Sequence, residues 1–171
     1  ILKKMGKSLY NRGPDDADCW VDMDSQIGLG HRRLSILDLS IAGRQPMVSG
    51  SGRYVIIFNG EIYNHLLLRR DLETSGRAPI WRGYSDTETL LAGFDAWGIQ
   101  ETIKRTVGMF AFALWCKQTH VLTLGRDRMG EKPLYYGWQG TGESKVFLFG
   151  SEFKALQAHP AFMGSINRDA V

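Results

Sequence analysis

The chain has few of the features that mark secreted, membrane-spanning or metal-binding proteins. Only two of its 171 residues are cysteine, Cys19 and Cys116, and neither has a CxxC neighbour or the spacing of metal ligands. Two structural thiols in a reducing cytoplasm are the favoured interpretation, with a disulfide as the alternative. The apolar runs are too short to cross a bilayer, and residues 1–7 lack the apolar core of a signal peptide. We therefore expect a cytoplasmic protein with no membrane partner.

An excess of charge of one sign is also lacking. The formal net charge is +3, from 21 basic and 18 acidic residues spread along the chain. No basic run with interleaved aromatic residues suggests a nucleic-acid partner. The four histidines show no HExxH or HxH spacing, so we expect no metal site. No Ser/His/Asp triad, Walker A loop or GxGxxG loop is apparent.

What is present is an alternation of strand and helix patterns in a length that suits one domain. Strands are predicted at 18–23, 26–34, 54–58, 109–116, 120–126, 134–138 and 146–150. Helices are predicted at 1–10, 64–75 and 85–97, with a short helix from about residue 152. Short links between neighbouring strands imply antiparallel pairing. Residues 54–58 and 108–115 are apolar on both faces of their strands, so other elements must pack against both faces. This predicts helices outside and two sheets within.

The most informative segment is the polar sequence that follows strand 54–58. Asn59, Gly60 and Glu61 stand at its end, where a buried strand can hold polar groups rigidly. A glycine allows close approach to a backbone N–H, and the Asn59 amide offers a second donor. Two converging N–H donors are what an oxyanion hole needs. The alternative is a hairpin turn, for which Asn-Gly is a common signal.

Two further positions carry candidate binding groups. Arg32 and Arg33 should point to opposite faces of their strand, so that one can bind a carboxylate inside the fold. The alternative is an exposed arginine pair on an edge strand. Asp86 lies in the first turn of a helix that Ser85 and Glu88 would open as a capping box. Its carboxylate could accept hydrogen bonds from a substrate ammonium group, or simply stabilise the helix N-terminus.

Taken together, the motifs of this chain resemble the class II glutamine amidotransferase domain, specifically the N-terminal half of the glutamine-dependent asparagine synthetase family. Eight motifs follow one another in the family's order across nearly the whole chain, which makes the resemblance specific. They are residues 12–16 (RGPDD), 31–36 (HRRLSI), 45–47 (QPM), 58–64 (FNGEIYN), 84–88 (YSDTE), 108–112 (GMFAF), 126–136 (RDRMGEKPLYY) and 150–152 (GSE).

The resemblance implies an α+β fold, a four-layer αββα sandwich of two antiparallel sheets like that of N-terminal-nucleophile hydrolases. It also implies a role for each site residue. Asn59 and Gly60 would form the oxyanion hole. Arg33 would hold the α-carboxylate of glutamine, with a wall shaped by Leu34, Ser35, Ile36 and Leu37. Glu61 and Asp86 would receive the α-ammonium group.

The chain departs from the family in one respect, since the family's nucleophile is a cysteine at the mature N-terminus. That cysteine uses its own α-amino group as the base. This sequence begins with Ile1, and neither Cys19 nor Cys116 can substitute. We interpret residues 1–160 as a glutaminase domain truncated at its N-terminus. Residues 161–171 would begin a linker to an absent C-terminal synthetase domain, where ATP and Mg²⁺ would bind. We expect no cofactor in this domain, and no activity from the 171-residue chain alone.

The intact protein would hydrolyse glutamine to glutamate and supply ammonia for ATP-dependent amidation of aspartate to asparagine. Its partners would be glutamine and the synthetase domain of the same chain, and assembly as a homodimer is left open. One alternative is a binding or scaffold domain that has lost catalysis. Another is a synthetase with a different acceptor, such as a modified sugar, a β-lactam precursor, or a phosphoribosyl or hexosamine substrate.

Overall fold

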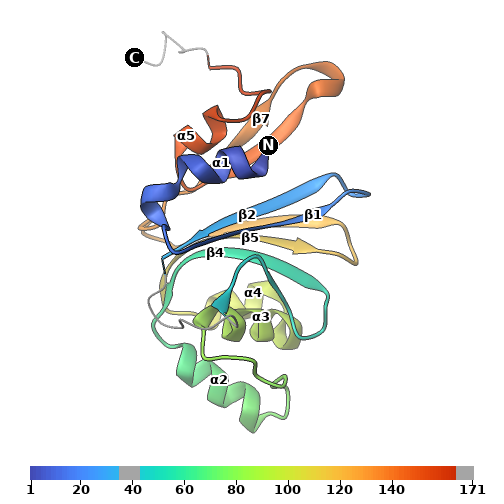
Figure 1. The fold of residues 1–171 in the computed structure, drawn as a ribbon. Helices are drawn as coiled ribbons and strands as arrows, with labels where there is room; N and C mark the ends of the chain where they lie inside the picture. Colours follow the sequence, from blue (N-terminus) through green and yellow to red (C-terminus); the bar gives the residue numbers. More distant parts are fainter. Residues whose placement is uncertain (35–42, 165–171) are drawn as a thin grey trace.

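The computed structural model describes residues 1–34 and 43–164 and shows helices and strands stacked in layers (Figure 1). The helices are α1 (Leu2–Ser8), α2 (His65–Thr74), α3 (Asp86–Trp97), α4 (Ile99–Arg105) and α5 (Phe153–Gln157). The strands are β1 (Asp16–Asp22), β2 (Ile27–Arg33), β3 (Met47–Val48), β4 (Tyr54–Ile62), β5 (Gly108–Cys116), β6 (Val121–Arg126), β7 (Tyr135–Gln139) and β8 (Val146–Gly150). Short 3₁₀ turns occupy Tyr10–Arg12 and Gly142–Ser144.

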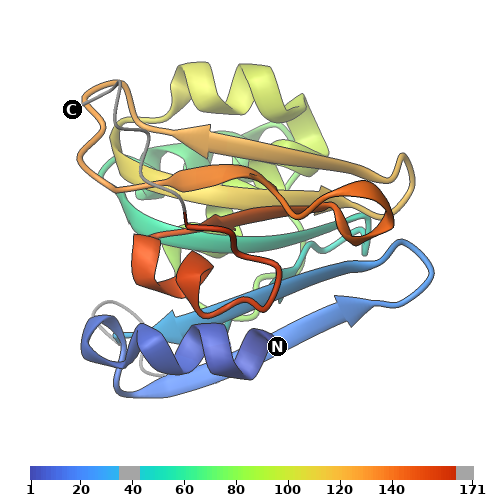
Figure 2. The same ribbon diagram turned by 90° about the horizontal axis from the view of Figure 1, so that it is seen from above.

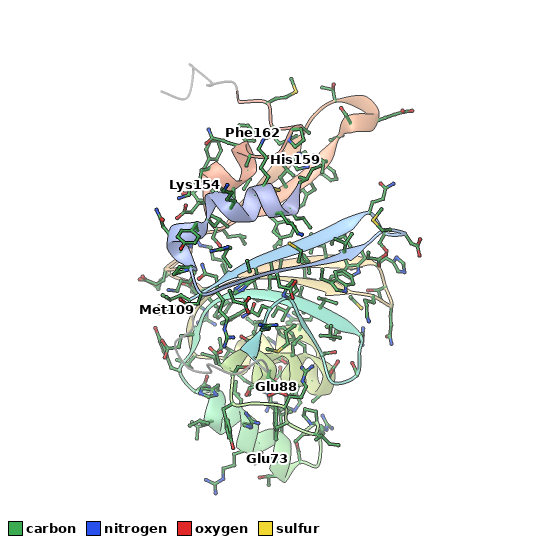
Figure 3. All side chains as sticks on the ribbon, viewed as in Figure 1. Glu73, Glu88, Met109, Lys154, His159 and Phe162 are labelled. Carbon is green, nitrogen blue, oxygen red and sulfur yellow. The ribbon has the colours of Figure 1, made fainter. Side chains whose placement is uncertain are left out.

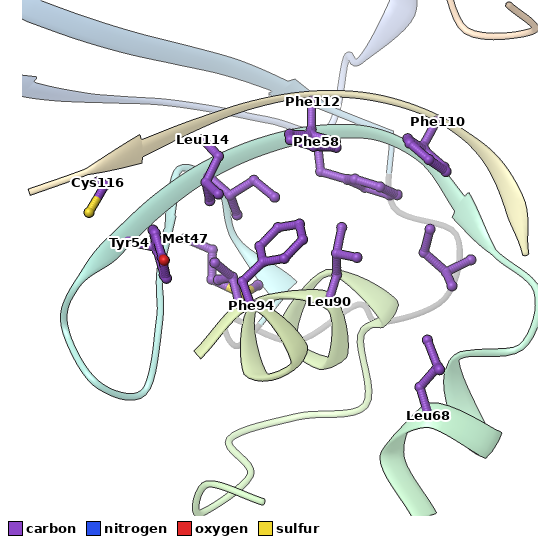
Figure 4. Packing of buried hydrophobic residues seen from close by; sticks show 13 residues of the cluster. Met47, Tyr54, Phe58, Leu68, Leu90, Phe94, Phe110, Phe112, Leu114 and Cys116 are labelled. Atoms are coloured by element: carbon purple, nitrogen blue, oxygen red, sulfur yellow. The ribbon is translucent and has the colours of Figure 1, made fainter. Parts of the chain in front are cut away.

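The centre of the fold is an antiparallel sheet in the order β3-β4-β5-β6. One face of this sheet packs on α3, with Ile56, Phe58 and Phe112 directed toward Leu90 and Phe94. Figure 4 shows this apolar cluster between the curved strands and the helix. Both β4 and β5 are apolar on both faces because this face meets helices and the opposite face meets a second layer of strands.

That second layer consists of two antiparallel hairpins, β1–β2 and β7–β8. Leu29 of β2 and Phe149 of β8 belong to one apolar cluster with Val55 and Trp115 of the central sheet. Both hairpins therefore pack on the same face of the four-stranded sheet. Within the described residues the two hairpins are not hydrogen-bonded to each other, so this layer is a pair of ribbons and not one continuous sheet.

The fourth layer is formed by α1 and α5, which lie over the two hairpins when the molecule is seen from above (Figure 2). Leu148 of β8 packs against Leu156 of α5, with Leu9 and Phe162 at the border of this small cluster. The side chains of Lys154, His159 and Phe162 mark this outer layer in Figure 3, and Glu73 and Glu88 mark the helices on the opposite side. The predicted αββα architecture is confirmed.

Three predicted elements needed correction. The strand predicted at 54–58 continues to Ile62, because residues 59–62 pair with residues 108–111 of β5. The short strand β3 lies in a segment where neither a strand nor a helix was predicted. The helix predicted at 85–97 corresponds to α3. It ends at Gly98, which has a φ of 79° and separates α3 from α4, a helix that was not predicted. A glycine accommodates this φ without strain, and the chain turns a corner there.

The helix starts also differ in detail from the predicted caps. Ser85 caps α3 as expected, since its Oγ accepts a hydrogen bond from the Glu88 N–H at 3.2 Å. The Glu88 carboxylate does not complete a capping box. It accepts from the backbone N–H groups of Arg82 and Gly83 and so holds the preceding loop. Asn64 stands at the N-cap position of α2, but its side chain forms no capping bond; it donates to the Arg105 carbonyl and accepts from the Val107 N–H.

Both cysteines are free thiols, in agreement with the favoured interpretation. Cys116 is buried at the end of β5, and Cys19 is partly exposed on β1. A search of the described helices for a length and apolarity sufficient to cross a membrane found no candidate.

Candidate active site

The candidate site lies along the free edge of β4. Even-numbered residues of this strand direct their backbone groups away from β5, as three hydrogen bonds show. The Tyr54 carbonyl accepts from the Ser49 N–H, the Phe58 N–H donates to Gln45, and the Ile62 N–H donates to Asp86. Beyond the two residues of β3, no strand of the described chain pairs with this edge. By alternation, the Gly60 N–H points to the same free edge, between Gln45 and Asp86.

Gly60 is fixed at this place by close packing of β4 on β5. A Cβ at this position would lie 2.2 Å from the Met109 carbonyl oxygen and 2.7 Å from Phe110 Cα. The glycine was predicted to permit approach of a substrate, and the structure adds a packing reason for it. Its N–H is therefore held on a strand that cannot shift without moving β5.

The Asn59 side chain lies on the face of β4 that meets the second layer. Val55 and Ile57, which share its parity, pack in the apolar cluster with Leu29. Asn59 Nδ2 is buried and has no hydrogen-bond partner within the described part of the chain. A buried N–H₂ group without an acceptor is costly, so it calls for an acceptor beyond those that the described residues supply.

The side chains of the two neighbouring arginines of β2 lie on opposite faces of the strand, as alternation predicts. Arg32 points to the α1 side, where Nε donates to the Gly13 carbonyl at 2.8 Å and the guanidinium lies 4.9 Å from the Tyr10 ring centroid. Arg33 has the parity of Leu29, which is buried against the central sheet. Arg33 therefore faces the space between the layers, as the predicted carboxylate-binding residue should. The prediction that it binds a carboxylate stays a prediction.

Asp86 reaches the end of β4 from the N-terminus of α3. Its Oδ2 accepts from the Ile62 N–H at 2.9 Å, and its Oδ1 accepts from the Thr87 N–H at 2.8 Å. Burial raises the pKa of the Asp86 carboxyl, while these two hydrogen bonds and nearby His65 act in the opposite direction. The negative charge of Glu61 adds to the rise. A cationic group placed between the two carboxylates would favour their ionised forms.

Two residues at this edge were not assigned a role from the sequence. His31 lies on β2 two residues before Arg33, and its Nε2 is 3.1 Å from the Phe58 carbonyl oxygen. Burial lowers the pKa of His31 to about 4, so the ring is neutral near pH 7. Gln45 accepts from the Phe58 N–H at 2.6 Å and donates to Thr87 Oγ1 at 3.3 Å. Neither contact has a local sequence signal, because each joins segments far apart in the chain.

The strands β2 and β4 run toward the same side of the molecule (Figures 1 and 4), so their ends bring the predicted groups to one region. Leu34 follows β2 and is exposed, and its predicted role in the site wall is untested. Ser35, Ile36 and Leu37 lie outside the described residues. Two surface hollows lie elsewhere: one of about 510 Å³ beside β6 and β7, and one of about 280 Å³ around Arg69 and Trp81. A search of the described residues found no cluster of metal-ligating side chains.

Comparison with known proteins shows the family to which the chain belongs. The family model described as "Glutamine amidotransferase domain" matches residues 1–171. The chain belongs to the glutamine amidotransferase domain family. It is 38% identical over 169 residues to asparagine synthetase [glutamine-hydrolyzing] 3 of Bacillus subtilis, a match that covers 98% of this chain and 26% of the relative. It is 42% identical over 156 residues to asparagine synthetase [glutamine-hydrolyzing] 1 of the same organism, covering 91% and 23%.

These relatives are much longer than this amidotransferase chain, which spans about a quarter of their length. Among solved structures, the glutamine phosphoribosylpyrophosphate amidotransferase of Bacillus subtilis aligns with a TM-score of 0.60 at 22% identity. That alignment covers 77% of this chain and 29% of the other. It supports the fold, and the predicted resemblance to the amidotransferase family is confirmed by the family match.

Proposed function

We propose that this domain binds glutamine at the free edge of β4 and, in the full-length protein, releases its amide nitrogen as ammonia. The observation that carries the proposal is the buried Asn59 amide beside the Gly60 N–H. Among residues 1–34 and 43–164, the amide nitrogen has no hydrogen-bond partner and no strand pairs with this part of the β4 edge. Two such donors suit the oxygen that becomes negatively charged when the side-chain amide of glutamine is attacked. Arg33 and the Asp86–Glu61 pair suit the α-carboxylate and the α-ammonium group.

The reaction needs a nucleophile, which the family resemblance assigns to an N-terminal cysteine. Its thiol would add to the amide carbon of glutamine, with the cysteine's α-amino group accepting the proton. The α-amino group would return that proton to the amide nitrogen, and collapse of the tetrahedral intermediate would expel ammonia and leave a thioester. Water would then hydrolyse the thioester to glutamate and release the free thiol. In this scheme Asn59 and Gly60 stabilise the oxyanion of each tetrahedral intermediate, while Arg33 and Asp86 hold the amino-acid end still.

The ammonia would be used by a synthetase domain in the same polypeptide, with residues 161–171 as the start of the connection. The support is the name of the relatives, which are glutamine-hydrolysing asparagine synthetases, and the small share of their length that this chain covers. The acceptor proposed is therefore aspartate, activated with ATP and Mg²⁺ in that domain. A cytoplasmic location, where these small metabolites are present, completes the proposal.

The test uses the full-length protein with glutamine labelled with ¹⁵N in the side-chain amide, together with ATP, Mg²⁺ and aspartate. We expect glutamate and asparagine carrying ¹⁵N in its side-chain amide, detected by mass spectrometry. No glutamate above a protein-free blank would refute glutamine hydrolysis and favour a binding or scaffold role. Glutamate with free labelled ammonia but no asparagine, in a preparation that makes asparagine from added ammonium chloride, would refute transfer between the domains. Glutamate without asparagine from either nitrogen source would refute aspartate as the acceptor.

A further inference from the structure

The three groups proposed to recognise glutamine come from three different elements. Arg33 ends β2, Asn59 and Gly60 belong to β4, and Asp86 begins α3. The β1–β2 hairpin and the sheet that holds β4 are separate sheets within the described residues. Nothing in strand pairing therefore fixes the distance between Arg33 and the oxyanion donors. Some other contact must set it, because glutamine has a fixed length between its α-carbon and its amide.

The contact lies at the backbone of Phe58, immediately before Asn59. The Phe58 carbonyl oxygen is 3.1 Å from His31 Nε2, and the Phe58 N–H donates to Gln45 Oε1 at 2.6 Å. Gln45 also donates from Nε2 to Thr87 Oγ1, in the first turn of α3 beside Asp86. The two side chains thus connect β2, β4 and α3 through a single residue of β4.

The contact between His31 and Phe58 defines which atom is the hydrogen-bond donor. A carbonyl oxygen only accepts hydrogen bonds, so Nε2 must carry the proton. Since burial keeps the ring neutral, Nδ1 then has no proton, and the tautomer is fixed by the bond to Phe58. His31 lies two residues before Arg33, and Phe58 lies two residues before Gly60. With both strands running the same way, a bond between His31 and Phe58 places Arg33 level with the Gly60 N–H.

We propose that His31 and Gln45 are positioning residues for glutamine, holding the carboxylate-binding, oxyanion-binding and ammonium-binding elements in register through the backbone of Phe58. Neither is proposed to touch the reacting atoms. The inference rests on the proposed glutamine-binding role of the same site. It adds that recognition of glutamine depends on two side chains that are not assigned to contact it.

A matched contact provides the control. At the far end of the same hairpin, Ser25 Oγ bonds His120 Nδ1 at 3.0 Å, in the turn between β5 and β6. That bond also ties the hairpin to the central sheet, but it lies at the opposite end of β2 from Arg33. Ser25→Ala therefore removes a hairpin-to-sheet bond of the same kind without touching the register of Arg33 and Gly60.

The experiment compares His31→Ala, His31→Gln, Gln45→Met and Ser25→Ala in the full-length protein. The readouts are kcat and KM for glutamine hydrolysis and the rate of asparagine formation from ammonium chloride. We expect His31→Ala and Gln45→Met to lower kcat/KM for glutamine by about 10- to 100-fold, mostly through KM, because a displacement near 1 Å is costly. His31→Gln, which can still donate to Phe58, should recover much of the loss. The kcat and KM of Ser25→Ala for glutamine should equal those of the wild-type protein. The rate of asparagine formation from ammonium chloride should be at the wild-type value in every variant.

The inference is overturned if His31→Ala and Gln45→Met keep the wild-type KM while the wild-type protein hydrolyses glutamine. It is also overturned if glutamine-driven and ammonia-driven rates fall together, since the two residues would then only support the fold. A wild-type protein that releases no glutamate would instead overturn the proposed function. If His31→Ala does not fold, His31→Gln is compared with His31→Asn, whose amide is too short to reach Phe58, and an equal KM for those two variants refutes the inference.

Discussion

The side chains of neighbouring residues on β2 face different layers of this fold. Arg32 is held on the outer side by the Gly13 carbonyl and the Tyr10 ring. On the same side, a Cβ on Gly28 would lie 2.6 Å from the Leu2 side chain, so α1 packs closely there. Arg33 faces the other way, into the space between the layers. The residue before or after Arg33 in the strand could not direct its side chain into this space, because adjacent strand residues point to opposite faces of the sheet.

Substitution of these two arginines should therefore have different consequences. In the full-length protein, Arg33→Ala should weaken use of glutamine by the equivalent of about 2–5 kcal/mol, since the substrate carboxylate loses a charged partner in a desolvated place. Asparagine formation from ammonium chloride, which bypasses this site, should be unaffected. Steady-state rates with each nitrogen source are the measurement. Arg32→Ala is the control, expected to change both rates alike or neither. Equal loss of both rates in Arg33→Ala would show that Arg33 supports the fold.

A second residue-scale prediction concerns Asn59. Asn59→Asp keeps the shape of the side chain but replaces the N–H₂ donor with an oxygen, which would repel the oxyanion. We expect kcat for glutamine hydrolysis to fall by at least about 10²–10³-fold, the range seen when one oxyanion-hole donor is lost. The ammonia-driven rate should again be preserved. A variant with wild-type kcat would remove Asn59 from the oxyanion hole and leave its buried amide without a function.

At the scale of elements, the strands were predictable and some of their ends were not. Residues 108–115 are apolar on both faces, and the predicted strand at 109–116 corresponds to β5 (Gly108–Cys116). The strand at 54–58 was predicted to stop at Phe58 because polar residues follow the apolar run, yet pairing with β5 carries β4 to Ile62. Helix α4 was missed because Gly98 is a helix terminator, and a second helix begins immediately after it.

Pairing of β4 with β5 leads to a prediction for two glycines. Gly60→Ala should destabilise the chain by about 1–3 kcal/mol or more, because its Cβ would clash with the Met109 carbonyl oxygen at 2.2 Å. Gly137→Ala, in β7, is the matched control. A Cβ there has no heavy atom within 4 Å, so the change should be neutral or slightly stabilising. Urea unfolding of the two variants measures the difference, and equal midpoints would contradict the close approach of the two strands.

At the scale of the whole molecule, the site depends on how separate layers meet. The residue types of the site could be predicted from the motifs, since Arg33, Asn59, Gly60 and Asp86 lie in recognisable segments. Their support could not. His31 and Gln45 contact the same residue, Phe58, from positions 27 and 13 residues away along the chain. No periodicity reports such contacts, because they arise only when the β1–β2 hairpin and α3 are placed on opposite sides of the central sheet.

The position of His31 between two layers, where the residue is partly buried, should make the stability of the whole fold depend on pH. Its pKa falls from 6.5 to about 4, with burial as the main cause and the charge of Arg33 adding to it, although the bond to Phe58 and the charge of Asp16 oppose the shift. Between these two values the unfolded chain binds more protons than the folded chain, so the free energy of unfolding rises with pH. The contribution is complete above pH 6.5 and is lost as the pH falls toward 4.

This contribution amounts to about 3 kcal/mol, at roughly 1.4 kcal/mol for each pKa unit. Urea unfolding of the 171-residue chain and of His31→Gln, at several pH values from 4 to 7.5, measures it. The glutamine side chain cannot titrate, so the slope of unfolding free energy against pH should be smaller in the variant. His159, whose pKa is also lowered by burial, contributes equally to both chains and cancels in the difference. Identical slopes would mean that the pKa of His31 is the same in the folded and unfolded chains, and this would contradict the lowering of that pKa by burial.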